Sequence, residues 1–567
     1  MRKYNKIFSR LIILSILFFS SCTDLDEELY SNVTSENFIQ TKEDVYRTFL
    51  RSFEHGYWTV QGDQYEMQEN TGDQLMTPTR GADWFDGGKY VRLHNHDWNT
   101  DDGFVRGAWM NLYSGIVLAT NSLEDIEALD PVNVKMSSEE QAQLIAELRI
   151  LRAWYYIRLF DFYRNIQIVT AVKGETDGPP QSTPKETFDY IENEILESVP
   201  ALLAKGEPGT ESFDGRWSKA AAMTLLARLY FNAEVFIDVA KYNECATITQ
   251  DIIDGTYGNY ELEERWDAPF DYNNNTSKGT IFAFPGSFTR THWHYTSGMF
   301  WWQFPANANL YFDFTAFGTS NPKFALQPGK DLSGEEYEFD LGKPFVKFEE
   351  YPDDVRLTKY KNTGLSSREG MFLYGYLPYN DGADYVMSKD GSYRIYLRDQ
   401  VGRFMDLPPD EEINGEISTM IMADENSGVR LVKYPFYSDD SPNKIEPDFV
   451  EIRLAEVYYM LAESRFREGN IAEAARLLNT VRKRYYPEGS ESLYEPSQLN
   501  EQELLDEWGR EFIGEGRRRT DLIRFGKFTT GTWWDKESDG GDEHLQIFPI
   551  AESVLNVNPQ LDQNPGY

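Results

Sequence analysis

The chain of 567 residues is short of cysteine, and this scarcity excludes one class of fold. It contains two cysteines, Cys22 and Cys245, so a framework of disulfide bonds cannot hold a chain of this length together. A hydrophobic core must do so instead. Apolar residues make up 41% of the sequence, which is enough to bury a large core and argues against disorder.

Basic residues are also scarce relative to acidic ones. The chain has 55 Lys and Arg against 93 Asp and Glu, which gives a formal net charge of −38. A surface of this sign repels the phosphate backbone of nucleic acids, so sequence-independent binding to DNA or RNA is excluded. The many carboxylates do not identify a glycosidase, because that chemistry needs one particular pair about 5–10 Å apart and the sequence cannot select it.

Several motifs of enzyme and cofactor chemistry are missing. The sequence has no P-loop, no G-x-G-x-x-G, no G-x-S-x-G and no H-E-x-x-H. The acidic segment 97–103 is similar to an EF-hand loop, but its glycine comes one position late and Ala108 stands where that loop needs Glu. We therefore expect no cofactor. A loosely bound calcium ion in the acidic loops stays open as an alternative.

Long hydrophobic runs are absent, and the longest run, at the N-terminus, is short. Residues 1–21 contain four basic residues, no acidic residue and an apolar run over 11–19. This run is too short to span a bilayer, which takes about 20 apolar residues. Two serines precede Cys22, so the layout is that of a lipoprotein signal peptide, with acyl chains such as palmitate attached to Cys22 after cleavage. An ordinary secretory signal with a chance cysteine is the alternative.

Helical periodicity dominates three parts of the remaining sequence. Apolar residues recur at spacings of three and four in 146–163, 217–236 and 450–468, which predicts amphipathic helices. Gly469 and Asn470 end the third helix, and another amphipathic helix follows. Two helices around a tight turn resemble a tetratricopeptide unit. A generic helical bundle is the alternative.

The segments 55–105 and 265–440 have a different character. They are dense in Gly, Pro, Asn, Asp, Trp and Tyr, and their helical periodicity is weak. Long irregular insertions on a rigid frame are where binding residues usually lie. We predict a mainly α fold after the signal: a tetratricopeptide-like helical scaffold, mainly in 105–265 and 445–567, with a loop-rich, aromatic-rich ligand-binding region, mainly in 55–105 and 265–440.

The most specific motifs lie in the C-terminal half. Residues 507–518 read EWGREFIGEGRR, residues 521–526 read DLIRFG, and the chain closes with NPGY. Further matching segments are AELRILRAWYY at 146–156 and TRGADWFDGG at 79–88. Together these segments resemble the SusD family, also called RagB/SusD, of outer-membrane nutrient-binding lipoproteins from Bacteroidetes. The resemblance covers essentially the whole chain from Cys22 onward.

The resemblance implies a lipoprotein anchored to the outer membrane that faces the extracellular surface. It would capture an oligosaccharide or polysaccharide, such as starch or fructan, and act as a lid on a SusC-like TonB-dependent barrel that imports it. SusD-like proteins carry out no chemistry, so the resemblance also implies that the chain is not an enzyme. Two alternatives are a surface glycoside hydrolase and a binder of another nutrient, such as peptide.

Candidate glycan-binding residues follow from the chemistry of sugars. A sugar ring has apolar C–H faces and a rim of hydroxyl groups, so its binder needs exposed aromatic rings and polar side chains. Trp84 is our first candidate for a stacking platform, because Arg80, Asp83 and several glycines surround it in the sequence. The further aromatic and polar candidates are Trp98, Trp301, Trp302, Asp73 and Arg368.

Overall fold

The computed structural model consists of a helical scaffold with a large loop-rich insertion. It describes residues 38–60, 62–174, 178–206, 214–287, 303–312, 322–364, 367–435 and 446–567. About 43% of the chain is helical and 10% is in strands, so the prediction of a mainly α fold is confirmed.

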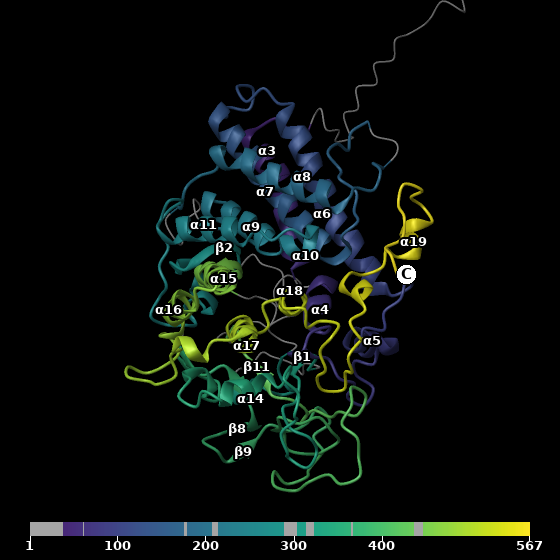
Figure 1. Cartoon of the computed structure of the whole chain (residues 1–567), viewed down its shortest axis with the longest axis vertical. Coiled ribbons are helices and arrows are strands. Elements are labelled where there is room, and N and C mark those ends of the chain that lie inside the picture. Colours follow the sequence, from purple (N-terminus) through teal and green to yellow (C-terminus); the bar gives the residue numbers. More distant parts are fainter. Residues whose placement is uncertain are drawn as a thin grey trace, which may run out of the picture.

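The scaffold helices follow one another in a continuous stack. They are α3 (Lys42–Thr59), α6 (Gly103–Glu127), α7 (Ser138–Tyr163), α8 (Pro184–Ser198), α9 (Lys219–Phe231), α10 (Ala233–Ile237), α11 (Tyr242–Ile253), α15 (Leu454–Arg467) and α16 (Ile471–Arg482). Packing runs from α3 to α6, α7, α8, α9, α11, α15 and α16 in turn. Figure 1 shows these helices in the upper two thirds of the molecule. C-terminal helices therefore extend a stack that N-terminal helices begin.

Shorter helices lie beside this stack or below it. They are α4 (Asp63–Glu69), α5 (Lys89–Asn95), α13 (Asn309–Phe312), α14 (Pro344–Glu349), α17 (Glu501–Phe512), α18 (Arg518–Arg524) and α19 (Glu552–Leu555). Single 3-10 turns are η1 (Asp86–Gly88), η2 (Val199–Ala201), η3 (Ala268–Phe270), η4 (Asn274–Thr276), η5 (Val355–Leu357), η6 (Pro496–Gln498) and η7 (Glu543–Gln546).

The strands are short and pair two by two, always antiparallel. The pairs are β1 (Leu75–Met76) with β3 (Ala325–Leu326), β2 (Thr280–Phe284) with β12 (Phe449–Arg453), β4 (Lys361–Gly364) with β5 (Ser367–Glu369), β6 (Phe372–Leu373) with β11 (Arg430–Leu431), β7 (Gly375–Tyr376) with β10 (Tyr396–Leu397), and β8 (Pro378–Tyr379) with β9 (Asp384–Tyr385). Because β2 and β12 lie side by side, the chain leaves the scaffold and returns to it at the same place. The loop-rich insertion between them forms the lower part of the molecule (Figure 1).

Local sequence explains where the scaffold helices begin and end. The Ser137 hydroxyl accepts the Glu140 N–H at 3.1 Å and caps α7, and Thr183 and Glu186 form a reciprocal capping box at the start of α8. Gly469 adopts a φ of 83° between α15 and α16, which is the left-handed conformation expected for a helix stop. The predicted turn between these two helices is therefore present.

Helix α7 lies at the centre of the scaffold and is buried more completely than the sequence suggested. Its apolar spacing predicted one buried face, yet nearly every residue from Leu144 to Tyr163 is buried, including Glu147, Arg152 and Asp161. The three charged side chains can be buried because each has a partner in the structure. A helix that is buried all round cannot be read from amphipathic spacing alone.

Helix α4 lies in the segment 55–105, which we expected to be loop-rich. Apolar periodicity is absent from this part of the sequence because the buried positions of α4 are largely polar. Gln68 Nε2 donates to Asp161 at 2.8 Å, and Glu69 Oε1 accepts the Gly516 N–H at 2.7 Å. Burial raises the pKa of the Glu69 carboxyl to about 7. Hydrogen bonds made by Gln68 and Glu69, rather than an apolar stripe, tie this helix to α7 and to the segment before α18.

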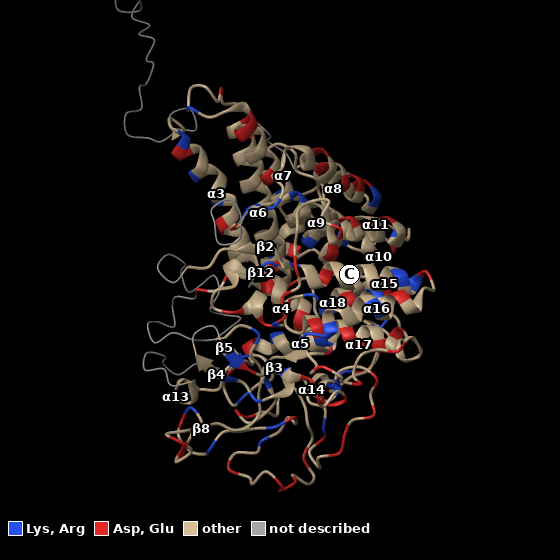
Figure 2. Cartoon of the chain, turned by 90° about the vertical axis from the view of Figure 1, so that its left-hand side faces the viewer, with Lys and Arg blue, Asp and Glu red and all other residues tan. Residues whose placement is uncertain are grey.

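The segment 507–518 supplies most of the buried charge that joins separate parts of the fold. One pair lies within a helix, where Arg510 donates to Glu507 at 3.0 Å. Most partners, however, are distant in the chain: Glu507 also pairs with Arg482, and Glu515 accepts from Arg453 at 2.7 Å. Acidic and basic positions adjoin around α17 and α18 in Figure 2. This segment therefore works mainly through tertiary ion pairs.

The C-terminal segment packs against the far end of α7. Asn564 Nδ2 donates to the carbonyl oxygens of Tyr163 and Phe548, at 2.9 and 2.8 Å. The Tyr567 hydroxyl accepts from Trp98 Nε1 at 2.7 Å. These contacts give the segment a structural role.

A buried ion pair between Arg518 and Asp73 connects the start of α18 to the loop before β1. The Arg518 guanidinium donates to both carboxylate oxygens of Asp73, at 2.6 and 3.0 Å, and the Gly342 N–H adds a third bond at 2.8 Å. Burial alone would raise the pKa of Asp73, but Arg518 outweighs it and lowers that pKa to about 2.

We expect Asp73→Asn to lower the free energy of unfolding by about 3–5 kcal/mol at pH 7, because it leaves the buried Arg518 charge without its partner. Since the folded pKa lies below the unfolded value, the difference between wild type and variant is full above pH 4 and shrinks as the pH falls towards 2. Denaturant unfolding at several pH values measures this difference.

The matched control is Asp189→Asn, which removes the carboxylate of an exposed pair with Lys185 on α8. This change should cost less than about 1 kcal/mol. Equal costs for the two variants would contradict the assignment of Asp73 as a structural anchor.

Candidate functional site

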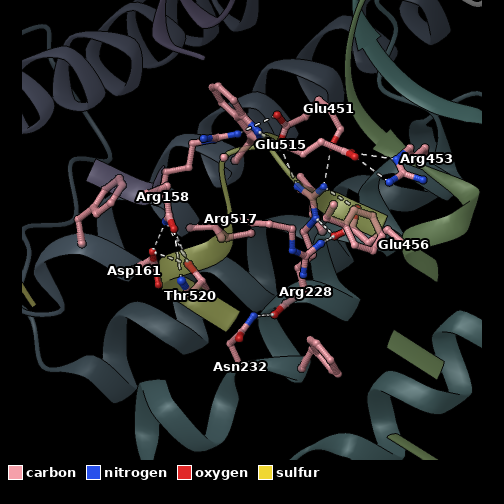
Figure 3. A pocket seen from close by; sticks show the side chains of 18 of the residues that line it. Arg158, Asp161, Arg228, Asn232, Glu451, Arg453, Glu456, Glu515, Arg517 and Thr520 are labelled. Atoms are coloured by element: carbon pink, nitrogen blue, oxygen red, sulfur yellow. Dashed lines mark hydrogen bonds and ion pairs between the residues drawn. The ribbon is translucent and has the colours of Figure 1, made fainter. Parts of the chain in front are cut away.

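Two cavities stand out in the described part of the chain, and the first lies inside the scaffold. It has a volume of about 120 Å³ and is lined by residues of α7, α9, β12, α15 and the α17–α18 segment. Arg228 pairs with Glu451 at 2.9 Å and with Glu456 at 2.7 Å, and Arg517 reaches Glu456 at 3.1 Å. Figure 3 shows these side chains facing one another across the cavity.

All charges around this first cavity are balanced. Arg158 pairs with Glu451 at 2.7 Å, and Arg453 pairs with Glu515 at 2.7 Å. None of its lining residues carries a buried side-chain N or O atom that lacks a hydrogen-bond partner. The cavity thus offers a ligand no unpaired group. We assign it to the scaffold and refer to it as the scaffold cavity.

The second cavity lies in the loop-rich part and has a volume of about 500 Å³. Its lining residues are Arg80, Gly81, Asp83, Pro322, Lys389, Asp390, Tyr393, Arg403, Met405, Ala423, Asp424 and Glu425. All of them fall in 55–105 and 265–440, the segments in which the sequence predicted ligand binding. We refer to it as the loop cavity.

Backbone pairing brings the two sides of the loop cavity together. The Thr79 N–H donates to the Met420 carbonyl at 2.7 Å, and the Ala423 N–H donates to the Thr79 carbonyl at 3.3 Å. Arg80 thereby lies beside Ala423 in a parallel bridge, although more than 300 residues separate them. Glu425 lies two residues after Ala423 in the sequence.

The loop after Arg80 has an unusual backbone. Trp84 and Asp86 adopt φ values of 65° and 43°, and Gly81 and Gly87 are also in the left-handed region. Residues with side chains rarely adopt positive φ, and the strain of about 1–3 kcal/mol persists where the surroundings enforce it. Met405 on the other side of the loop cavity has a φ of 48°. Such strain is concentrated at functional sites in many proteins.

Arg80 is the buried cation of the loop cavity. It is 6% exposed, and its Nη1 donates to the carbonyls of Pro322 and Lys323 at 2.7 and 3.1 Å. Its Nε and Nη2 have no hydrogen-bond partner in the protein. Burial lowers the pKa of Arg80 to about 10, opposed by the nearby Glu425 and Asp424, so the group stays charged at neutral pH.

Asp424 and Glu425 are half-buried carboxylates that line the loop cavity. Asp424 accepts the N–H groups of Met405 and Asn426 at 2.6 and 2.9 Å. Glu425 accepts the Lys389 N–H through Oε1 at 2.8 Å, whereas its Oε2 has no partner. Burial raises the pKa of both carboxyls. Glu425 therefore has one acceptor oxygen, Oε2, without a hydrogen-bond partner, and Arg80 has two donor nitrogens, Nε and Nη2, without one.

The rim of the loop cavity combines an aromatic ring with exposed side chains. Tyr393 is half-buried and its hydroxyl accepts the Glu425 N–H at 3.4 Å. Arg403 and Met405 are exposed, and Lys389 reaches Asp83 at 3.3 Å. The loop cavity thus has a ring, an apolar side chain and hydrogen-bonding groups within one space.

Three of the predicted glycan-binding residues belong to this region. Arg80 and Asp83 line the loop cavity, and Trp84 follows Asp83 directly. Trp84 is half-buried, packs edge-to-face on Tyr90 at 6.3 Å between ring centroids, and has the Lys323 ammonium 5.2 Å from its own centroid. The ring is therefore held in a fixed position beside the loop cavity.

Three other predicted residues have packing roles instead, and we do not include them in the site. Asp73 is fully buried against Arg518, and Trp98 is 5% exposed and bonded to Tyr567. Arg368 is buried by its side chain, donates to Asp267 at 3.1 Å and lies over the ring of Trp266. Each is polar or aromatic like a ligand residue, but its groups are turned into the protein. The predictions for Trp301, Trp302 and Cys22 lie outside the described residues.

Sequence reasoning did not select Tyr393, Asp424, Glu425, Arg403 or Met405. These residues carry no motif, and their role depends on the pairing of Thr79–Arg80 with residues 420–423. The sequence indicated only the segment that contains them, because turn-forming residues surround them in 265–440. As for metals, no group of three or more His, Cys, Asp or Glu side chains within the described ranges is arranged to hold an ion.

Comparisons with known proteins agree with this architecture. A family model described as "SusD family" matches residues 412–567, and one described as "Starch-binding associating with outer membrane" matches residues 25–231. Starch-binding protein SusD of Bacteroides thetaiotaomicron is 28% identical over 449 residues, which are 76% of this chain and 74% of that protein. SusD-like protein P25 of Formosa agariphila is 23% identical, with 98% and 99% covered.

Solved structures share the fold. A laminarin-binding SusD-like protein superposes with a TM-score of 0.64 at 18% identity, over 93% of this chain and all of that one. Surface glycan-binding protein A from Bacteroides uniformis gives 0.63 at 18% identity, over 92% and 99%.

The resemblance to the SusD/RagB family that the sequence predicted is confirmed by these matches over residues 25–231 and 412–567. The proteins of this family are glycan-binding proteins without catalytic activity, in agreement with the prediction made from the resemblance.

We expect Glu456→Gln to lower the free energy of unfolding by about 3 kcal/mol, because it removes the shared partner of Arg228 and Arg517 at the scaffold cavity. Ligand affinity should change by less than about twofold, since the cavity is structural. Thermal unfolding and glycan titration of the same samples measure both effects.

The control is Glu473→Gln, in an exposed pair with Arg476 on α16, which should leave stability nearly unchanged. A large loss of affinity in a stable Glu456→Gln protein would contradict the assignment of this cavity to the scaffold.

Proposed function

We propose that this chain is a surface lipoprotein that binds an oligosaccharide or polysaccharide in the loop cavity. It then acts as a lid on a SusC-like TonB-dependent barrel of the outer membrane, through which the glycan is imported. The single observation that carries the proposal is the loop cavity itself. It holds unpaired donors on Arg80 and an unpaired acceptor on Glu425 next to an aromatic ring.

The chemistry of the loop cavity suits a sugar. A hydroxyl group can accept a hydrogen bond from a guanidinium and donate one to a carboxylate, and a ring such as Tyr393 can cover an apolar sugar face. Buried polar groups without a partner are costly, so a ligand that satisfies Arg80 and Glu425 gains from doing so. We also propose that Trp84 forms an aromatic wall at the edge of this site.

The relatives support the same kind of ligand. The names of the similar proteins describe them as starch-binding, laminarin-binding and surface glycan-binding. They differ in the glycan they name, so they support a class of ligand and not one polymer. Attachment to the membrane is proposed through acylated Cys22. Across the described ranges, no helix combines the length and apolar composition needed to cross a bilayer.

We expect Tyr393→Ala to weaken glycan binding about tenfold or more, because it removes the aromatic surface of the loop cavity. Affinity gels with a panel of neutral polysaccharides, followed by calorimetric titration of the polymer that retards the wild type, measure the loss. Tyr257→Ala is the control, since Tyr257 is another half-buried tyrosine, located after α11 and away from the lining. If no polysaccharide retards the wild type, the proposed function is wrong.

We expect Cys22→Ser to remove the acyl anchor and to move the protein from the membrane fraction to the soluble extract. Labelling with a palmitate analogue should disappear in the same variant, because acyl chains provide the anchoring free energy. Cys245→Ser is the matched control: Cys245 is a free, buried cysteine, and its replacement should leave both fractionation and labelling unchanged. Membrane retention by Cys22→Ser would contradict the lipid anchor.

A further inference from the structure

The loop cavity contains a matched pair of unsatisfied groups with opposite hydrogen-bonding character. Arg80 offers Nε and Nη2 as donors, and Glu425 offers Oε2 as an acceptor. Arg80 is buried, Glu425 is half-buried, and both line the same cavity. Glu425 is also the nearby charge that acts most strongly on Arg80, yet no ion pair joins the two. Because both residues line the loop cavity, a ligand bound there lies beside both side chains.

Building on the proposed function, we infer that this site selects uncharged glycans with two adjacent hydroxyl groups, which Arg80 and Glu425 bind together. One hydroxyl accepts from the Arg80 guanidinium and its neighbour donates to Glu425 Oε2. Vicinal hydroxyls on a pyranose ring suit this arrangement because each can serve as donor or acceptor. The Arg80 guanidinium and the Glu425 carboxylate then each gain a charge-assisted hydrogen bond.

The charges around the site disfavour an acidic sugar at this position. Three cationic side chains line the loop cavity, Arg80, Lys389 and Arg403, against four carboxylates, Asp83, Asp390, Asp424 and Glu425. Lys389 is already paired with Asp83.

A uronate or sulfate placed beside Arg80 would also meet Asp424 and Glu425, which are half-buried and therefore less screened than fully exposed charges. Like charges brought together in this way reject the wrong ligand.

Glu425 is a better residue than Arg80 to replace in a test of this pair, because its replacement disturbs fewer structural contacts. Arg80 holds the carbonyls of Pro322 and Lys323, so its replacement would disturb the loop. Glu425→Gln keeps an oxygen that can accept the Lys389 N–H, and converts the free acceptor into an amide donor. This change removes one half of the pair with the least effect on the fold.

The test is calorimetric titration of the full-length protein with neutral malto- and inulo-oligosaccharides, whose rings carry adjacent hydroxyl groups. Each is compared with its counterpart oxidised at the primary hydroxyls to carboxylates. We expect the wild type to bind a neutral form at least about tenfold more tightly than its oxidised counterpart. Glu425→Gln should weaken neutral binding by about 10- to 100-fold, as for the loss of a hydrogen bond to a charged group, and reduce the preference for the neutral form.

Glu488→Gln is the control, because Glu488 is an exposed carboxylate outside the lining of the loop cavity, and it should behave as the wild type. The inference is overturned if the oxidised oligosaccharide binds as well as the neutral one, or if Glu425→Gln keeps the wild-type affinity and preference. The proposed function survives either result. Absence of binding to every oligosaccharide, neutral or oxidised, refutes both.

Discussion

The structure depends on buried ion pairs between arginines of the C-terminal signature and carboxylates elsewhere in the chain. Arg518 holds Asp73 ahead of β1, and its neighbour Arg519 holds Asp161 on α7 at 2.9 Å. Two adjacent side chains thus fix two segments that are 88 residues apart in the sequence. Buried pairs of this kind add little net stability, but losing one partner is costly. They therefore specify which segments meet more than they strengthen the fold.

This constraint positions the binding region. The insertion leaves the scaffold at β2 and returns at β12, and these two strands pair with each other, so its ends are fixed to the helical stack. Asp73 lies seven residues before Arg80, and its bonds to Arg518 and Gly342 join the scaffold to the insertion. A loop site on such a base can keep its geometry without regular secondary structure around it.

The two cavities show how the same residue types serve different purposes. Around the scaffold cavity, every arginine meets a carboxylate and no polar atom of the lining is left over. In the loop cavity, Arg80 and Glu425 have side-chain atoms without a hydrogen-bond partner in the protein, and Trp84 and Met405 have strained backbones with positive φ. Local violations of this kind are expected where a protein binds a ligand, because the ligand completes what the fold leaves open.

The sequence by itself determined the family, the mainly α class, the helices around 146–163 and 450–468, and the regions from which the loop cavity is built. Periodicity and short motifs are local properties, so they can be read along the chain. It did not reveal α4, whose buried face is polar, and it could not separate Asp73, which is buried in an ion pair, from Arg80, which lines the loop cavity. Only the tertiary structure decided these points, because the partner of a polar side chain is set by the packing of distant segments.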